Sequence, residues 1–199
     1  RQLRRHGAEV NVYLTDAGSK FITPLSLEWA SGRHIIMDMS GLAEHICTED
    51  IVVVAPCTAN TLGKVQSDVC DNNVTLKIRS AMGMNKPVLF AVAMHESLWK
   101  EPTATIQSLI IPGRKSEGKI KIAKPETIVD YVIRAARTSK ENASRSVLIT
   151  AGPTFAPIDD VRGVINIFRG RIGIEIAKEL WYQGFNPTLL LGMFGRLDR

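Results

Sequence analysis

Apolar runs of the kind found in buried strands alternate with amphipathic segments along most of the chain. The runs IVVVAP (51–56) and KPVLFAVAM (86–94) are rich in β-branched residues and almost uninterrupted, which is typical of parallel strands covered on both faces. Segments 58–67 and 71–81 between them read as helices, and VNVYLT (10–15) and HIIMDM (34–39) read as shorter strands. This alternation predicts an α/β fold with a doubly wound parallel sheet.

Local signals mark where several helices begin and end. Thr23 followed by Pro24 is typical of an N-cap and first turn, so a short helix is expected from there to Ala30. The opening RQLRRHG suits the last turns of a helix that stops at Gly7. A chain that opens at the end of such a helix is expected to lack an earlier strand. Segment 124–137 has the 3.6-residue apolar pattern of a closing helix.

A second unit follows a polar stretch. TSKENASRS lacks periodicity, and behind it come a strand (VLITAGPT), a helix (170–181) and another strand (NPTLLLG). We therefore expect a first domain over 1–137, a linker over 138–145, and the opening part of a second Rossmann-like domain over 146–199.

Composition narrows the class of protein. The 45% apolar and 23% charged residues are ordinary for a globular chain, and no apolar run approaches the roughly 20 residues of a membrane-crossing helix. The net charge of +5 is spread evenly, which argues against a nucleic-acid partner. Three cysteines without a CxxC pair read as reduced thiols, so we expect a cytoplasmic protein without a membrane partner.

Polar residues gather where the buried strands end. APCTANT (55–61) lies at a strand-to-helix turn, where main-chain N–H groups and hydroxyls suit a phosphate or a polar ring, although Thr58 or Asn60 can equally be a plain helix cap. Asp71 and Asn72 in CDNNVT can also simply cap a helix.

Two of the histidines are candidates for proton transfer. His45 lies just ahead of the first buried strand, and His95 follows the second, at the edge where APCTANT ends. An imidazole takes or gives a proton near neutral pH, but a lone histidine is more often a structural residue. The histidines and carboxylates are not at ligand spacing, so no metal site is expected.

The second unit holds a glycine-rich segment, AGPTFAPIDDVRGVINIFRGRIG (151–173). Its AGPT follows a strand, and Gly170 and Gly173 flank Arg171 at a helix start, so main-chain amides and a guanidinium can converge on a phosphate. The glycines do not satisfy the GxGxxG pattern, so the residues alone indicate a nucleotide site only in general terms.

Taken in order, these motifs resemble those of a known family. FITPLS, EHI, APCTANT, CDNNVT, KPVLFAVAMHESLW and EGKIKIA, followed by LITAGPT and PIDDVR, are similar to the bifunctional coenzyme A biosynthesis flavoproteins. In that family a phosphopantothenoylcysteine decarboxylase is fused to a phosphopantothenate–cysteine ligase. The resemblance spans nearly the whole chain and is incomplete at both ends.

The resemblance implies an FMN-dependent decarboxylation of 4′-phosphopantothenoylcysteine to 4′-phosphopantetheine in a trimer-based homo-oligomer. It implies that His45 is catalytic. It places Thr15, Thr23, Thr58, Asn60 and Thr61 at the flavin, and Asp71, Asn72, Met94 and His95 at the flavin or the substrate carboxylate.

For the second unit, the resemblance implies a ligase that activates phosphopantothenate with CTP and Mg²⁺ before cysteine attacks. Gly152, Pro153, Thr154, Asp159, Asn166 and Arg171 match positions around the nucleotide and the acyl intermediate. The resemblance implies further ligase residues beyond Arg199, so we expect this half to be incomplete in the chain.

The chain departs from the family at two places. Many relatives have Asn where this chain has His95, and the stretch PGRKSEGKIKIA lacks the cysteine that serves as proton donor in the family. Either another acid replaces it, with Lys119 or Lys121 as candidates, or this branch closes its site differently. Three alternatives therefore stay open: another flavin-dependent cysteine decarboxylase, a flavin prenyltransferase, or a regulatory subunit without catalysis.

Overall fold

The computed structural model describes residues 1–103, 106 and 109–192. It divides into two compact units, Arg1–Val132 and Ile133–Arg199. Within these described residues, no helix has both the length and the apolar character needed to cross a bilayer.

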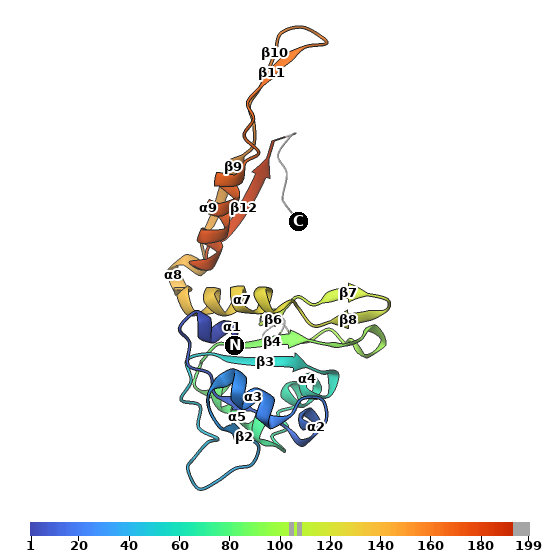
Figure 1. Cartoon of the computed structure of the whole chain (residues 1–199), viewed down its shortest axis with the longest axis vertical. Coiled ribbons are helices and arrows are strands. Elements are labelled where there is room, and N and C mark those ends of the chain that lie inside the picture. Colours follow the sequence, from blue (N-terminus) through green and yellow to red (C-terminus); the bar gives the residue numbers. More distant parts are fainter. Residues whose placement is uncertain (104–105, 107–108, 193–199) are drawn as a thin grey trace. The chain divides into compact units, whose positions relative to one another are not determined.

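The core of the first unit is a parallel sheet in the order β3 (Val52–Cys57), β4 (Val88–Val92) and β6 (Ile110–Ile111), seen in Figure 1. Every residue of β4 is buried, as expected for a central strand with neighbours on both sides. The largest fully buried side chains of the first unit include Phe90 of β4, Ile78 and Ile111. The α/β class with parallel strands is confirmed.

Helices connect these strands and begin where the capping signals predict. Helix α3 (Pro24–Ser31) starts at Thr23, whose side chain accepts a hydrogen bond from the Ser26 N–H, and α4 (Ala59–Gln66) starts at Thr58. Helix α5 (Asn73–Gly83) starts at Asn72 with a complete capping box. Figure 1 shows α4 and α5 on the same side of β3. Helix α7 (Pro125–Arg137) closes the series, as predicted.

Shorter elements complete the first unit. The opening helix α1 (Gln2–Arg5) leads into a two-stranded parallel pair, β1 (Val12–Tyr13) and β2 (Ile35–Ile36). Between them lies α2 (Asp16–Ser19). A second, antiparallel sheet has the order β5 (Met94–His95), β8 (Lys119–Lys121) and β7 (Arg114–Ser116), and the 3₁₀ turn η1 (Glu96–Leu98) follows β5.

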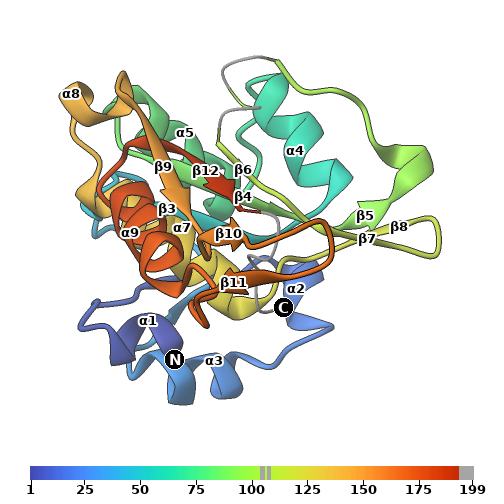
Figure 2. The ribbon, with the colours of Figure 1, turned by 90° about the horizontal axis from the view of Figure 1, so that it is seen from above.

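The second unit is a parallel pair, β9 (Ser146–Ala151) and β12 (Asn186–Leu191), joined through helix α9 (Arg171–Tyr182). A hairpin of β10 (Phe155–Pro157) and β11 (Gly163–Ile165) stands between β9 and α9 in the chain, and both views show its two strands side by side (Figures 1 and 2). Residues expected to form a linker contain a short helix, α8 (Lys140–Ala143), which begins at the side-chain cap of Ser139.

Arg134 joins the two ends of this second unit. Its guanidinium donates hydrogen bonds to three main-chain carbonyls in the last turn of α9 and just beyond it, at Trp181 (2.5 Å), Phe185 (2.9 Å) and Gly184 (3.2 Å). Carbonyl groups at a helix C-terminus lack partners within the helix and carry partial negative charge, so a fork-shaped cation satisfies several at once.

Candidate functional site

Two predicted site segments meet at the carboxyl edge of the parallel sheet. Strands β3 and β4 pair with Cys57 opposite Val92, and the Ala93 N–H donates to the Cys57 carbonyl at 2.9 Å. Thr58 and Met94 come directly after these residues, so the turns that follow the two strands share one edge, as is usual for ligand sites of α/β sheets. Thr58 Oγ1 accepts the Thr61 N–H at 3.4 Å, which confirms its capping role.

A cavity of about 400 Å³ opens beside the start of α5. This volume lies in the range of small-molecule sites. Three predicted site residues line it together: Thr15, Asp71 and Asn72. The other lining residues are Asp16, Met37, Asp38, Met39, Cys70, Asn73 and Leu76.

Asp71 contributes a negative charge to the lining of this cavity. Lys64 Nζ donates to Asp71 Oδ2 at 2.6 Å, and this hydrogen bond holds the pKa of the Asp71 carboxyl below its ordinary value. Asn72 Nδ2 donates to Asp71 Oδ1 at 2.9 Å, while its Oδ1 accepts the N–H groups of Val74 and Thr75 at 3.0 Å. Asn72 therefore caps α5 and orients Asp71 at the same time. Sequence reasoning missed Lys64, although it lies in the LGKV that follows APCTANT.

His95 is held in one tautomer by its own turn. Its Nδ1 accepts the Ser97 N–H at 3.2 Å and lies 2.8 Å from Ser97 Oγ. Because a main-chain N–H can only donate, a neutral His95 carries its proton on Nε2. The residue is exposed, and a Cβ added to Gly118 would lie 3.8 Å from Nε2. The tip of the β7–β8 hairpin thus adjoins the imidazole, and Lys119 pairs with His95 across β5 and β8.

His45 lies in the turn that precedes β3, with an exposed side chain. Within residues 1–103, 106 and 109–192, no hydrogen bond joins it to the cavity residues or to Thr58, Asn60 and Thr61. Thr23 caps α3 and is not among the residues lining the cavity. The structure therefore places Thr15, Asp71 and Asn72 at the cavity and the Thr58 and Met94 turns at the sheet edge, whereas Thr23 and His45 lie in neither place.

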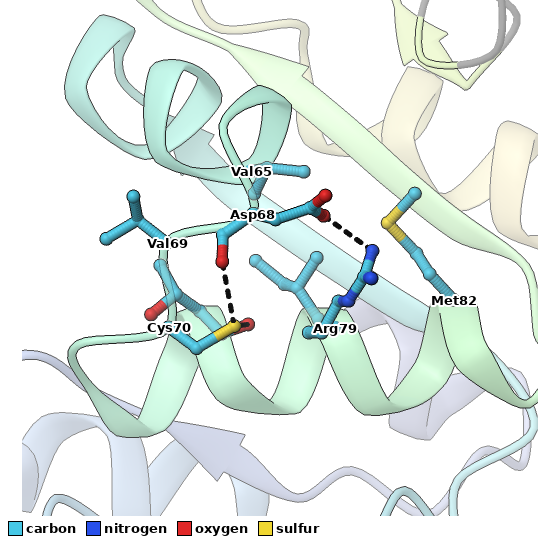
Figure 3. Close-up of a pocket in the computed structure, with 8 residues that line it drawn as sticks. Val65, Asp68, Val69, Cys70, Arg79 and Met82 are labelled. Carbon is cyan, nitrogen blue, oxygen red and sulfur yellow. Dashed lines mark hydrogen bonds and ion pairs between the residues drawn. The ribbon is translucent and has the colours of Figure 1, made fainter.

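A second, much smaller pocket lies between α4 and α5 (Figure 3). Arg79 forms an ion pair with Asp68 at 2.5 Å across it, and Cys70 Sγ donates to the Asp68 carbonyl at 3.7 Å. Its volume of about 10 Å³ is at the lower limit for a single water molecule, so it is a packing gap and not a ligand site.

In the second unit, three glycines converge where β9, β12 and the start of α9 meet. Gly152 has φ +129° and Gly170 has φ +83°, conformations that favour glycine. A Cβ on Gly170 would lie 2.9 Å from the Gly152 nitrogen, and one on Gly152 would lie 2.9 Å from the Gly192 nitrogen. The main chain of these glycines therefore approaches closely at the start of α9, which no described side chain caps. Arg171 follows at once and is exposed.

The other predicted nucleotide residues fix local loops. Asn166 Nδ2 donates to Thr154 Oγ1 at 3.1 Å, which ties the end of the hairpin to its beginning. Asp159 accepts the Arg162 N–H at 2.6 Å and its Nε at 2.7 Å, and these bonds hold the pKa of the Asp159 carboxyl below its ordinary value. Pro153 follows Gly152 at the end of β9.

Comparison with known proteins gives the family. Residues 1–142 match the family model described as Flavoprotein, and residues 142–196 match that of the DNA/pantothenate metabolism flavoprotein C-terminal domain. The coenzyme A biosynthesis bifunctional protein CoaBC of Thermococcus kodakarensis is 34% identical, over 96% of this chain and 50% of that protein. A cysteine/cysteine sulfinic acid decarboxylase from an unknown prokaryotic organism is also 34% identical, over 86% of this chain and 54% of that protein.

A solved structure of a PPC decarboxylase mutant complexed with pantothenoylaminoethenethiol is 28% identical, with a TM-score of 0.50 over 66% of this chain and 85% of that chain. The chain spans about half the length of the curated relatives it matches. Because the first family model matches 142 residues from the start of a 199-residue chain, the chain belongs to the flavoprotein family.

Proposed function

We propose that the first unit is an FMN-dependent decarboxylase that converts 4′-phosphopantothenoylcysteine into 4′-phosphopantetheine and carbon dioxide. The observation that carries the proposal is the cavity that gathers Thr15, Asp71 and Asn72 in a member of the flavoprotein family. The 28% identity to a PPC decarboxylase supports the choice of substrate.

The residues present suit a flavin nucleotide. Hydroxyl and amide groups of Thr58, Asn60 and Thr61 stand at the start of α4, where main-chain N–H groups favour a phosphate or a polar ring edge. Thr15 and Thr23 would add further hydroxyl contacts. When bound, FMN would supply the oxidation and later re-reduction of the thiol-bearing carbon, because a cysteinyl carboxylate has no carbonyl of its own to accept electrons.

The chain's own residues would then hold the substrate and its protons. The Nε2–H of His95 donates a hydrogen bond to the substrate carboxylate, as the amide of an asparagine would, and leaves the carboxylate free to depart as neutral carbon dioxide. The Lys64–Asp71 pair presents a charged carboxylate as acceptor. Met94 lies beside His95 at the sheet edge. His45 exchanges a proton with the substrate.

We propose the domain organisation that the motifs predict: a decarboxylase domain over 1–137, a linker over 138–145 and the opening part of a CTP- and Mg²⁺-dependent ligase domain over 146–199. The glycine convergence around Gly152 and Gly170 supports a nucleotide beside Arg171. Pro153, Thr154, Asp159 and Asn166 would frame the same site. A trimer-based homo-oligomer and a cytoplasmic location belong to this proposal.

The relative that acts on cysteine and cysteine sulfinic acid favours a second candidate, decarboxylation of the free amino acid. One experiment separates the two. The purified chain, loaded with FMN, is given 4′-phosphopantothenoylcysteine, cysteine or a peptide with a C-terminal cysteine, and carbon dioxide release is measured. We expect release from the first substrate, and its loss in His45→Asn with flavin retained. Release from cysteine alone would establish the second candidate, and a fully active His45→Asn would remove His45 from the mechanism.

A further inference from the structure

Helix α5 carries a polar stripe on the face that packs into the first unit. Asn73, Lys77 and Ser80 follow one another at intervals of four and three residues, which places them on one side of the helix. Each bonds to main-chain groups far away in the sequence. Asn73 Nδ2 donates to the carbonyls of Leu14 at 3.2 Å, Ile36 at 2.9 Å and Met37 at 2.7 Å, so it joins the ends of β1 and β2 beside the cavity.

Lys77 is the middle member of the stripe, and its ammonium group is fully used. Its side chain is only 4% exposed. Nζ donates to the carbonyls of Glu44 at 3.1 Å and Ile46 at 2.9 Å, and it lies 2.8 Å from the Glu49 carboxylate. Three N–H groups thus meet three oxygens, and the charge also lies 4.7 Å from the centre of the Tyr13 ring. A buried cation with every donor satisfied is fixed in position.

The two carbonyls that Lys77 holds belong to the residues immediately before and after His45. The Glu44 carbonyl is part of the peptide group directly before His45, and the Ile46 carbonyl is part of the second peptide group after it. The peptide group between them is held by the Ile46 N–H, which donates to the Ala43 carbonyl at 2.9 Å, so the main chain is fixed on both sides of His45 and sets the direction in which its side chain leaves the backbone. The Tyr13 hydroxyl donates to the Glu44 carbonyl at 3.3 Å and adds to this anchor. The imidazole itself is exposed, so it is free to meet a ligand while its backbone is held from the interior.

We propose that Lys77 is a positioning residue for His45: its buried ammonium clamps the main chain on both sides of the imidazole. The proposal rests on the function proposed above for His45. The ammonium group of Lys77 is enclosed by protein oxygens, so we expect it to act through His45 and not by contact with substrate or cofactor. Misplacement of a catalytic group by about 1 Å lowers turnover by as much as 100-fold, so Lys77→Met is expected to lower kcat between about 10- and 100-fold. The KM and the amount of bound FMN should stay within about twofold.

The chain offers a matched control. Lys86 Nζ donates to the carbonyl of Cys47 at 2.9 Å, so Lys86→Met removes the same kind of lysine–carbonyl bond two residues beyond His45 and leaves the bonds of Lys77 to the Glu44 and Ile46 carbonyls intact. If Lys77 only stabilises the fold, both variants should lose stability and keep the kcat of the wild type. If Lys77 positions His45, kcat should fall in Lys77→Met and stay within about twofold in Lys86→Met.

A second readout needs neither turnover nor flavin. The chain has four histidines, and the ring signal of His45 in a ¹H–¹³C spectrum is the one that disappears in His45→Asn. We expect this signal to shift and broaden in Lys77→Met and to keep its wild-type position in Lys86→Met. If the wild type fails to decarboxylate any substrate, the proposed function falls, while the spectrum still tests whether Lys77 holds His45.

Should Lys77→Met not fold, Lys77→Arg takes its place. Arginine keeps the charge opposite Glu49 but is longer and carries its donors on a planar fork, so we expect none of them to stand where the single Nζ of Lys77 meets the two carbonyls. We expect the same fall in kcat and the same change in the His45 signal. An unchanged kcat together with an unchanged His45 signal, in whichever Lys77 variant folds, would overturn the proposal.

Discussion

The buried pair of Glu49 and Lys77 should make the stability of the first unit depend on pH. Burial alone would raise the pKa of the Glu49 carboxyl, but hydrogen bonds from Lys77 and Asn11 outweigh it and lower that pKa to about 2. Burial likewise opposes the charge on Lys77, yet Glu49 and Tyr13 keep the pKa of Lys77 above its ordinary value. Both groups are therefore charged at neutral pH.

The size of the effect follows from the two pKa values. A carboxyl with a pKa of 4.5 when unfolded and about 2 when folded contributes about 3 kcal/mol of stability at neutral pH. Because the folded value is the lower one, this contribution is complete above pH 4.5 and is lost as the pH falls through 2. About 2 kcal/mol of it should be lost between pH 6 and pH 3. The Glu49 side chain is 19% exposed, so solvent screening reduces these figures only in part.

Glu49→Gln is the perturbation that tests this reasoning. It leaves a buried cation without a counter-charge, and we expect a loss of about 3–5 kcal/mol at pH 7. The assay is urea unfolding followed by tryptophan fluorescence in a Trp181→Phe background, so that the signal comes from Trp29 and Trp99 of the first unit. The stability gap between the wild type and Glu49→Gln should narrow by about 2 kcal/mol between pH 6 and pH 3.

The control is an exposed ion pair of similar length. Glu9 lies 2.6 Å from Arg33, but its side chain is 83% exposed, so Glu9→Gln should change stability by about 1 kcal/mol or less at any pH. A gap between the wild type and Glu49→Gln that stays constant from pH 6 to pH 3 would refute the assignment of a low pKa to Glu49.

Three further predictions address other parts of the molecule. His95→Asn should keep most of the decarboxylase turnover because it keeps a donor, whereas His95→Leu should lose about 10-fold or more in steady-state assays; equal rates would refute the donor role. Arg134→Met should destabilise the second unit by about 2–4 kcal/mol, because it removes the hydrogen bonds to the carbonyls at the end of α9, and urea unfolding followed through Trp181 fluorescence would measure the loss. An unaltered urea midpoint would contradict this role of Arg134. Of the three thiols, only the exposed Cys70 should react quickly with a maleimide in the folded protein, because Cys47 and Cys57 are buried and burial raises the pKa of Cys57 to about 12. Mass spectrometry of the labelled peptides would refute this if Cys47 or Cys57 were modified as fast as Cys70.

Much of the fold could be predicted because the decisive signals are local. The β-branched runs before Thr58 and Ala93 identify two central strands, and the caps at Thr23 and Asn72 mark helix starts that the structure confirms. The hairpin of β7 and β8 was not predicted, because RKSEGKIK is polar and its pairing with β5 joins residues about 25 positions apart. Such pairing depends on tertiary contacts that no short window of sequence contains.

The polar groups behind the candidate site were the hardest to foresee. Asn73 bonds to a carbonyl 59 residues away, and Lys77 bonds to carbonyls 33 and 31 residues away. In the sequence both residues read as ordinary polar positions of a helix. The acceptors of these hydrogen bonds are main-chain oxygens, which every residue type supplies, so no pattern of side chains in the sequence predicts the bonds. The roles of His45 and of the flavin and nucleotide residues stay predictions.

The boundary between the two units falls within a helix and not in the polar stretch that follows it. Val132 closes one unit and Ile133 opens the other, so both lie in α7, which ends at Arg137. Dividing the gene at the polar stretch after Arg137 would leave the downstream product without Arg134 and without its hydrogen bonds to the carbonyls of Trp181, Gly184 and Phe185. A shorter protein that is meant to fold as the downstream unit should therefore begin at or before Pro125, so that it includes the whole of α7.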